Sequence, residues 1–240
     1  MIRKHLRNIA LAAALLAAPS AALASTLEMQ PVMLKVVAPE AASTITLRNT
    51  GTDPINAQVR VFKWSQGGGK DKLAATRDVV ASPPAIKLAP GKSTVIRVVR
   101  LNKAAIAGEE TYRLLIDEVP KPPKAAKVGV GISLRYSVPV FFAAADASAA
   151  LKWQASLSGG KLRIAAVNAG TMHVRLADLS ISAKGKTINV APGLAGYVLG
   201  NSANSWAVKA GGISAGQTIK IIAKGDNGAV EATVPVVAGN

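Results

Sequence analysis

Short segments in which apolar and polar residues alternate recur along almost the whole chain, and this pattern restricts it to β structure. Residues 43–49 and 55–64 are clear examples, separated by a polar turn that ends at Asp53-Pro54. Successive side chains of a strand point to opposite faces, so each segment buries one face and exposes the other. Gly, Pro, Asn or Asp interrupts the pattern roughly every 8 to 12 residues, as in all-β sandwiches. The sequence therefore predicts an all-β fold.

Turn residues separate the predicted strands. Pro90 and Gly91 occupy the second and third positions of a predicted type II turn, and residues 67–69, all glycine, predict a flexible loop. An X-Pro bond at Pro83-Pro84 is expected to be either a cis bond that shapes the loop or a rigid trans turn. The candidate strands are residues 43–49, 55–64, 86–88, 93–101, 111–119, 128–142, 162–167, 173–182, 187–190, 206–208, 218–223 and 229–237.

The first 24 residues have the three parts of a secretory signal peptide. A positive segment with Arg3, Lys4 and Arg7 precedes an apolar run, and small residues end the segment at Ala24. The apolar run is shorter than the roughly 20 residues that a membrane-spanning helix needs. We predict that residues 1–24 are removed by cleavage near Ala24, and that the exported chain does not insert into a membrane.

An alanine-rich stretch, residues 143–150, separates two regions of similar size. We predict a first domain over residues 25–145 and a second over residues 146–240, each long enough to bury a core. The chain has no cysteine, which excludes thiol chemistry and cysteine–zinc sites. Stability must therefore come from packing and from the hydrogen bonds of the sheets.

Basic residues outnumber acidic ones by 29 to 13, a formal net charge of +16. Residues 1–24 hold three of the basic residues and no acidic one, which leaves 26 against 13, or +13. Such a charge attracts acidic partners. The basic residues are scattered singly, however, and three Trp, three Tyr and three Phe offer little surface for stacking on bases. We therefore predict no nucleic acid partner.

The sequence lacks the groups that a conventional enzyme needs. Of its two histidines, His5 lies in the predicted signal peptide, and a lone His173 cannot form a metal site of several imidazoles. Asp117 and Glu118 are adjacent acids, but neighbours on a strand point to opposite faces. No nucleophile elbow or phosphate-binding loop is found. We predict a protein without catalysis, metal or cofactor.

The longest β-run, residues 128–142, follows a basic, proline-containing segment at 121–127 that predicts a mobile loop. Its first half has one apolar face, and the intervening positions are Gly, Gly, Ser and Arg; the apolar residues are Val128, Val130, Ile132 and Leu134. Without further information, alternate apolar residues of this kind are expected to pack the chain's own core.

Four stretches in this order resemble the periplasmic pilus-assembly chaperones of the chaperone–usher pathway. They are Leu47-Arg48-Asn49, the Pro-Pro and Pro-Gly pairs of residues 82–91, residues 110–120, and Leu134-Arg135-Tyr136-Ser137-Val138-Pro139-Val140-Phe141. The Arg-Tyr-Ser-Val-Pro-Val segment resembles the branch that serves archaic and spore-coat-U-like pili. Fainter support comes from residues 160–168, 173–175 and 197–199.

The resemblance implies an L-shaped pair of immunoglobulin-like β-sandwiches in the periplasm. It further implies that the last strand of the first domain completes a pilus subunit that lacks a strand, and that the complex is delivered to an outer-membrane usher. On this interpretation Val128, Val130, Ile132 and Leu134 fill the groove of the subunit. An unpaired apolar strand of this kind also favours self-association of the free chaperone.

Two basic residues of the family hold the C-terminal carboxylate of the subunit, and this chain departs from that pattern. Counting along the strands, the two basic positions fall on Met33 and Pro139. Lys35 and Arg135 share the strand faces of these residues, so we expect Arg135 to be the main carboxylate anchor and Lys35 a weaker one. The alternative is that both are solvated strand residues.

Two other functions fit the same fold, because a fold does not determine function. An exported adhesion or carbohydrate-binding module is the main alternative, but exposed aromatic residues and paired acids for calcium are scarce. A pilus subunit would carry one incomplete domain and an alternating N-terminal donor segment. Two complete domains and an internal donor strand favour the chaperone.

Overall fold

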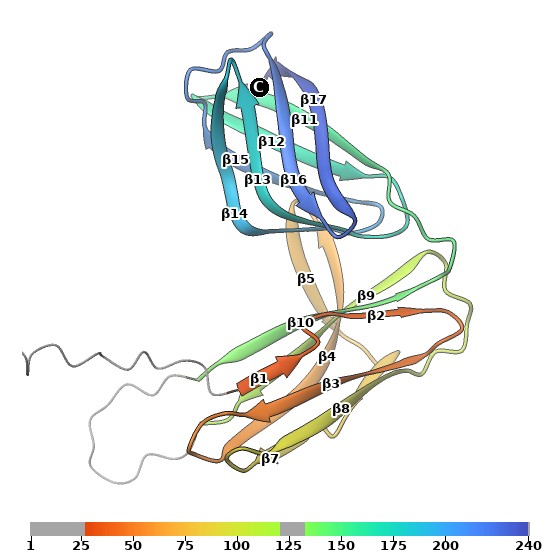
Figure 1. Cartoon of the computed structure of the whole chain (residues 1–240). Helices are drawn as coiled ribbons and strands as arrows, with labels where there is room; N and C mark the ends of the chain where they lie inside the picture. The colour runs from red at the N-terminus through yellow and green to blue at the C-terminus, as the bar shows by residue number, and fades with distance from the viewer. Residues whose placement is uncertain (1–26, 121–132, 240) are drawn as a thin grey trace, which may run out of the picture.

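The computed structural model describes residues 27–120 and 133–239, and every regular element in these ranges is a β-strand. The strands form two β-sandwiches set at an angle, the first built from β1 to β10 and the second from β11 to β17 (Figure 1). The predicted all-β fold with two sandwiches is thereby confirmed. No helix in the described part of the chain is long and apolar enough to cross a membrane.

The strands of the first sandwich are β1 (Leu27–Gln30), β2 (Leu34–Val37), β3 (Ala42–Asn49), β4 (Ile55–Gly67), β5 (Lys70–Ala75), β6 (Val79–Ser82), β7 (Ala85–Leu88), β8 (Ser93–Arg100), β9 (Glu109–Glu118) and β10 (Arg135–Ala143). Those of the second are β11 (Leu151–Ser158), β12 (Lys161–Asn168), β13 (Val174–Ala183), β14 (Lys186–Val198), β15 (Ser202–Lys209), β16 (Thr218–Gly225) and β17 (Gly228–Ala238).

The first sandwich consists of the sheets β1-β3-β8-β6 and β2-β10-β9-β4-β5, with β7 paired to β4. Its core follows the alternation of the sequence: Ile45 and Leu47 of β3 are fully buried, as are Leu114 and Ile116 of β9 in the facing sheet. A buried aliphatic side chain of this size contributes roughly 1.5–3 kcal/mol. The period of two therefore determines which face of each strand joins the core.

The second sandwich has the strand order β14-β13-β16-β17-β11-β12-β15. Strand β17 belongs to both layers, because residues 228–235 of β17 pair with β16 whereas residues 236–238 pair with β11. Its core contains Leu162, Ile164, Ile181, Ile219 and Ile221, all fully buried. Residues 144–150, between β10 and β11, hold no strand. The division into residues 25–145 and 146–240 stays a prediction.

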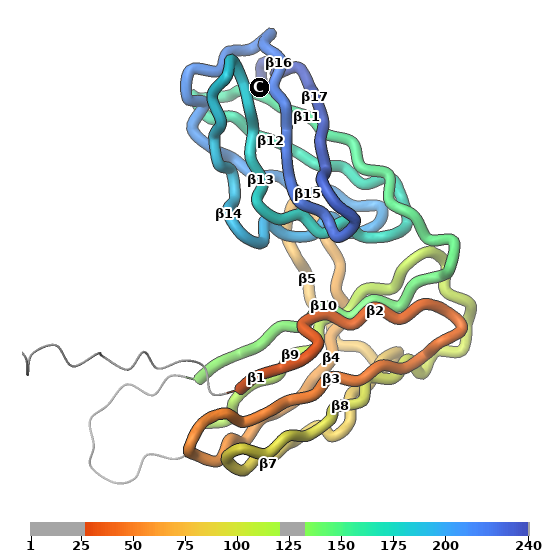
Figure 2. Tube along the Cα trace, in the orientation of Figure 1, coloured from red at the N-terminus to blue at the C-terminus, as the bar shows by residue number. Residues whose placement is uncertain are grey.

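The prediction of a flexible loop at the three glycines 67–69 is wrong. Gly67 pairs with Lys70, so Gly68 and Gly69 alone form a tight turn that leads into β5. Both have positive φ, 63° and 71°, as a type I′ hairpin turn requires. The β4–β5 hairpin extends from the first sandwich to the second (Figure 2).

Two turn predictions have clear outcomes. Gly91 has φ 68° and the Lys92 N–H donates to the Ala89 carbonyl over 3.2 Å, which confirms the predicted type II turn. At the paired prolines, the X-Pro bond between Ser82 and Pro83 is cis, which is the first of the two predicted alternatives.

The same Asn-x-Gly motif closes one strand in each sandwich. Asn49 at the end of β3 and Asn168 at the end of β12 are fully buried or nearly so. The Asn168 Oδ1 accepts N–H groups from Ala150 and Gly170, and its Nδ2 donates to the Met172 carbonyl over 2.7 Å. Asn49 likewise accepts from Gly51 and donates across the sandwich. Each amide therefore satisfies buried backbone groups that have no strand partner.

We predict that Asn168→Ala lowers the free energy of unfolding by on the order of 3 kcal/mol, because it leaves several buried backbone groups without a partner. Asn189→Ala is a matched control, since Asn189 is exposed on β14. Chemical denaturation measures both. Equal stability of the two variants would contradict the role given to the amide.

Candidate functional site

The first half of β10 is an open sheet edge. Strand β10 pairs with β9 along its whole length, from Arg135 to Ala143. On its other side β2 runs parallel to it only from Val140 to Ala143. Among the described residues no strand covers the edge from Arg135 to Pro139. Such an edge presents backbone N–H and C=O groups to which another strand can add.

The predicted donor residues are only partly within the described chain. Val128, Val130 and Ile132 lie outside the described residues, whereas Leu134 lies directly before β10 and is 37% exposed. The residues of the same parity in β10 pack in or against the first core; they are Tyr136, Val138, Val140 and Phe142. Leu134 therefore lies on the same face of the chain as these core residues, but at a position that the rest of the sandwich no longer covers.

Arg135, the predicted main anchor, lies at the outer end of the open edge. Its guanidinium binds Asp117 of β9, which also accepts a bond from Arg60 over 2.6 Å. Burial of Asp117 raises its pKa, but the hydrogen bonds from Arg135 and Arg60 outweigh this and hold the pKa below its usual value. The Arg135 side chain remains 61% exposed.

Lys35, the predicted weaker anchor, lies instead at the junction of the two sandwiches. Its ammonium group forms an ion pair with Asp226 of the second sandwich over 2.5 Å. Lys35 is in register with Phe141, six residues from Arg135 on β10, so about 20 Å separates the two positions along the strand. The structure therefore does not bring the two predicted anchors together.

A cluster of aromatic rings holds the two sandwiches together. Trp64 of β4 and Phe141 of β10 pack against Tyr197 and Leu199 of the second sandwich, and all four are buried. The ring centroids of Trp64 and Tyr197 are 5.4 Å apart in an edge-to-face arrangement. Such contacts add to the stabilisation from buried area.

Gln66, near the tip of the β4–β5 hairpin, fixes the same junction through hydrogen bonds. Its Nε2 donates to the Tyr197 carbonyl, and its Oε1 accepts from the Leu199 N–H and the Ser202 hydroxyl, each over 2.9 Å. A side chain that bonds the backbone of the other sandwich in this way limits sliding between them.

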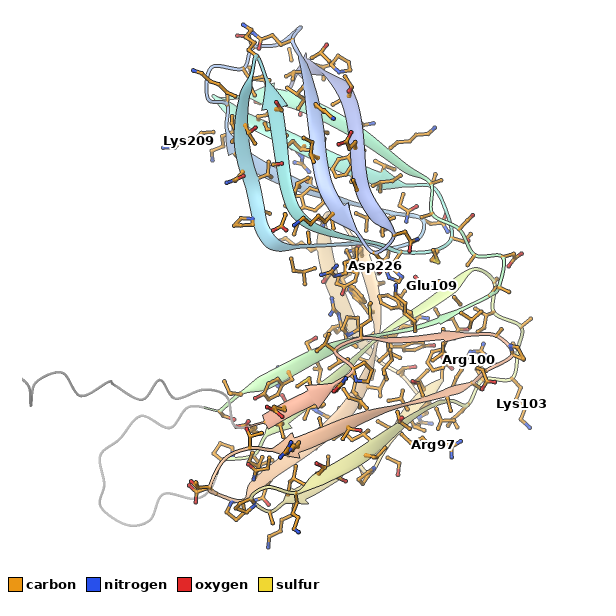
Figure 3. The ribbon with its side chains drawn as sticks, viewed as in Figure 1. Arg97, Arg100, Lys103, Glu109, Lys209 and Asp226 are labelled. Carbon is orange, nitrogen blue, oxygen red and sulfur yellow. The ribbon has the colours of Figure 1, made fainter. Side chains whose placement is uncertain are left out.

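Glu109 and His173 form a further contact at the junction. The Glu109 carboxylate accepts the backbone N–H of His173 and lies 2.8 Å from the ring Nδ1, with both side chains buried. The imidazole stacks on Phe141 with centroids 3.6 Å apart. A cavity of about 230 Å³ beside them is lined in part by Lys35, Arg175 and Asp226. Glu109 and Asp226 lie on opposite sides of the junction (Figure 3).

Arg113 is a junction residue that the sequence reasoning missed. Its guanidinium lies 3.7 Å above the Trp64 ring, 5.4 Å from the Tyr197 ring and 3.9 Å from the Asp71 carboxylate. Burial lowers the pKa of Arg113, against the opposing influence of Asp71 and Tyr197. On β9 it is directly opposite Pro139, the position at which the sequence lacks the expected basic residue. The strand register that places it there cannot be read from Arg113 alone.

The Arg60–Asp117–Arg135 group predicts a dependence of stability on pH. Because the folded-state pKa of Asp117 is lowered, its contribution is present above the unfolded value near about 4 and is lost as pH falls through the folded value. We expect Asp117→Asn to cost about 1 kcal/mol at neutral pH and to reduce the loss of stability on acidification. Denaturation at several pH values measures this, with exposed Asp146→Asn as the control. If the free energy of unfolding depends on pH in the same way in Asp117→Asn and in the unmodified protein, the role given to Asp117 is wrong.

The described residues contain no group of three His, Asp or Glu side chains suited to a metal ion. The arrangement offers instead an open strand edge, a fixed interdomain junction and several basic side chains beside them. These features suit the binding of an extended polypeptide.

Comparison with protein families matches residues 26–146 to the model of the pili and flagellar-assembly chaperones, PapD N-terminal domain. Comparison with curated proteins finds no match. Among solved structures the chain is similar to the CsuC–CsuE complex, a chaperone with a tip adhesion subunit from the archaic Csu pili of Acinetobacter baumannii. That match has a TM-score of 0.67 and 26% identity, and it covers 90% of this chain and 100% of the other.

Two further structures agree in fold. The CupB2 chaperone of Pseudomonas aeruginosa gives a TM-score of 0.56 at 18% identity, covering 86% of this chain and 98% of the other. The complex of SafA pilin with the SafB chaperone of Salmonella enterica gives a TM-score of 0.61 at 19% identity, covering 88% of this chain and 98% of the other. The two sandwiches are therefore immunoglobulin-like, and they are set at an angle as the predicted L shape requires (Figure 1). The family match extends over half of the chain, and the chain belongs to the pili and flagellar-assembly chaperones.

Proposed function

We propose that this pilus-assembly chaperone works in the periplasm by lending a β-strand to a pilus subunit that lacks one. The observation that carries the proposal is the open edge of β10 from Arg135 to Pro139. Its backbone groups provide a template for pairing, and the core face of the strand continues at Leu134 into an exposed apolar position. Both properties are needed to complete another sandwich.

The physical need for such a partner follows from the incomplete subunit. A sandwich without one strand exposes an apolar groove between two unpaired edges, and both promote aggregation in water. In the proposed complex the backbone of β10 pairs with an edge while Val128, Val130, Ile132 and Leu134 enter the groove. At about 1.5–3 kcal/mol for each buried side chain, they contribute several kcal/mol before the costs of association.

A basic group at the junction would fix the register of the bound strand by holding the terminal carboxylate of the subunit. Arg113 is our first choice, because it lies in the junction, packed on Trp64, and is opposite Pro139, the last residue of the open edge, on the strand next to β10. Lys35 lies in the same junction, about two residues along the strand direction from Pro139. Arg135 is engaged with Asp117 at the outer end of the edge, where it would contact the subunit along its length.

We propose the remaining steps from the family. Residues 1–24 direct export and are cleaved near Ala24, and residues 25–145 and 146–240 form the two domains. The chaperone delivers its subunit to an outer-membrane usher without catalysis, and it belongs to the archaic or spore-coat-U-like branch. In the absence of a subunit, the same open edge would permit self-association.

No observation gives comparable support to a carbohydrate-binding module. Trp153 and Trp206 lie next to each other, with centroids 6.1 Å apart and ring planes tilted by 33°, and both are partly buried against the second core. They therefore form no exposed aromatic platform of the kind that sugar binding would need.

We predict that Ile132→Asp combined with Leu134→Asp abolishes recovery of a soluble complex, because charges cannot enter the apolar groove. The measurement is co-expression in the periplasm with the pilin-like proteins encoded beside the chaperone. The matched control is Val80→Asp combined with Val95→Asp, since both valines are exposed on the opposite sheet of the first sandwich. Recovery of the complex by the donor-strand variant at the control level would refute the assignment.

We also predict that Arg113→Gln weakens subunit binding by about 10- to 100-fold, the usual contribution of a hydrogen-bonded charge. Arg97→Gln is the control, because Arg97 is exposed on β8 away from the junction (Figure 3). Lys35→Gln and Arg135→Gln are measured alongside. A subunit extended by one C-terminal residue has its carboxylate out of place, so it should bind the unmodified chaperone more weakly by the same factor. Its affinity for the Arg113→Gln chaperone should be no lower still. Additive losses would rule out Arg113 as the carboxylate anchor.

A further inference from the structure

One face of the second sandwich has basic side chains and no acidic ones. The strands β11, β12 and β15 are neighbours in the sheet, and none contains Asp or Glu. Their alternate residues enter the core, so the others form the outer face. Beside its basic residues this face carries Val167 and small or polar residues, which are Gln154, Ser156, Ser158, Ala165, Ala203, Ala207 and Ser205. Ser205 lies next to Gly69 at the tip of the β4–β5 hairpin.

Three basic residues gather at the distal end of this face, and we call Lys161, Arg163 and Lys209 the cation triad. Lys161 and Lys209 are directly opposite each other on β12 and β15, a position in which side chains start about 5 Å apart. Arg163 lies two residues from Lys161 on the same face, about 7 Å away. All three are exposed, and Lys209 points away from the molecule in Figure 3.

Like charges directly opposite each other destabilise a sheet. The second sandwich offsets such repulsion elsewhere, because Arg175, Lys220 and Lys224 each form an ion pair with an acidic residue. No described acidic residue forms an ion pair with the cation triad. The repulsion between these cations therefore lowers the stability of the sheet, and an anionic partner that binds them would remove it.

The character of the face indicates the class of partner. The residues between the cations are mainly alanine and serine, so the charges stand on a sheet surface without bulky side chains around them. A protein interface normally buries a core of aromatic and large apolar residues, whereas this face offers Val167 and, from the adjoining end of β17, Val237. An extended anionic surface needs no such core and can contact every cation at once.

We propose that the outer face of β11, β12 and β15 docks on a bilayer surface that carries anionic phospholipids, with the cation triad against the headgroup phosphates. Lys152 lies on the same face, four residues before Ser156, and adds a fourth contact. Each basic residue near such a surface strengthens binding about fivefold, so the triad provides about a hundredfold. The association is electrostatic and is therefore weakened by salt.

The test uses the exported full chain purified from the periplasm, mixed with vesicles of phosphatidylcholine alone or with added phosphatidylglycerol. Co-sedimentation at low and high salt gives the fraction bound. We expect binding only to the anionic vesicles at low salt, and a loss of about a hundredfold in the variant Lys161→Gln, Arg163→Gln, Lys209→Gln. Thermal unfolding of this variant should show equal or slightly raised stability, because repulsion is removed.

The matched control removes three exposed lysines elsewhere, in the variant Lys92→Gln, Lys103→Gln, Lys186→Gln. It carries the same net charge as the triad variant and should bind vesicles almost as the unmodified protein does. If both variants lose vesicle binding equally, the net charge of the protein alone determines the binding, and the proposed docking face is wrong. Failure of the unmodified protein to bind anionic vesicles at low salt overturns it as well. Recovery of the pilus subunit by the triad variant measures the chaperone activity separately.

Discussion

The second half of β10 is buried on both faces, and most of the structure depends on this. Val140 and Phe142 belong to the first core, while Phe141 between them stacks on His173 and packs near Trp64 and Tyr197. One strand thus joins the core of the first sandwich to the junction with the second. A change in the junction therefore acts directly on the strand whose outer half is the open edge.

The short pairing with β2 gives β10 its two roles. Where β2 is present, from Val140 onwards, the strand is an interior strand of a complete sheet. Where it is absent, the same strand is an edge, which soluble proteins normally protect with charges or covering segments. Arg135 and Ser137 are polar and exposed at this edge. In this pilus-assembly chaperone, an edge that is left open but carries polar side chains is consistent with a partner that adds a strand.

The alternation of the sequence predicted the strands that form the cores, such as β3 and β9, because burial on one face imposes a period of two. It failed for β5, since every residue from Lys70 to Ala75 is exposed and the strand is held by pairing with β4. It also passed over β11, although Leu151, Trp153, Ala155 and Leu157 do alternate. That signal was weakened by the alanine-rich residues before it.

The candidate site was less predictable than the fold because it depends on register between distant strands. Lys35 and Arg135 were chosen by counting along single strands, and this places each on a face but not beside a partner. Only the pairing of β9 with β10 puts Arg113 opposite Pro139. A run such as Val140-Phe141-Phe142 indicates burial on both faces, but it does not identify the second surface, which here belongs to the other sandwich.

The junction contacts come from different parts of the sequence and restrain different motions. The packed aromatic rings resist separation of the sandwiches, whereas the bonds of Gln66 to backbone groups resist sliding, and the ion pair of Lys35 with Asp226 joins the two sandwiches across the junction. Arg113 lies among these contacts and is packed on Trp64, so its side chain is held before any partner arrives. A group positioned in advance loses less conformational entropy on binding. In the proposed function, the rigidity of the junction is therefore a condition for fixing the register of an added strand at the edge of β10.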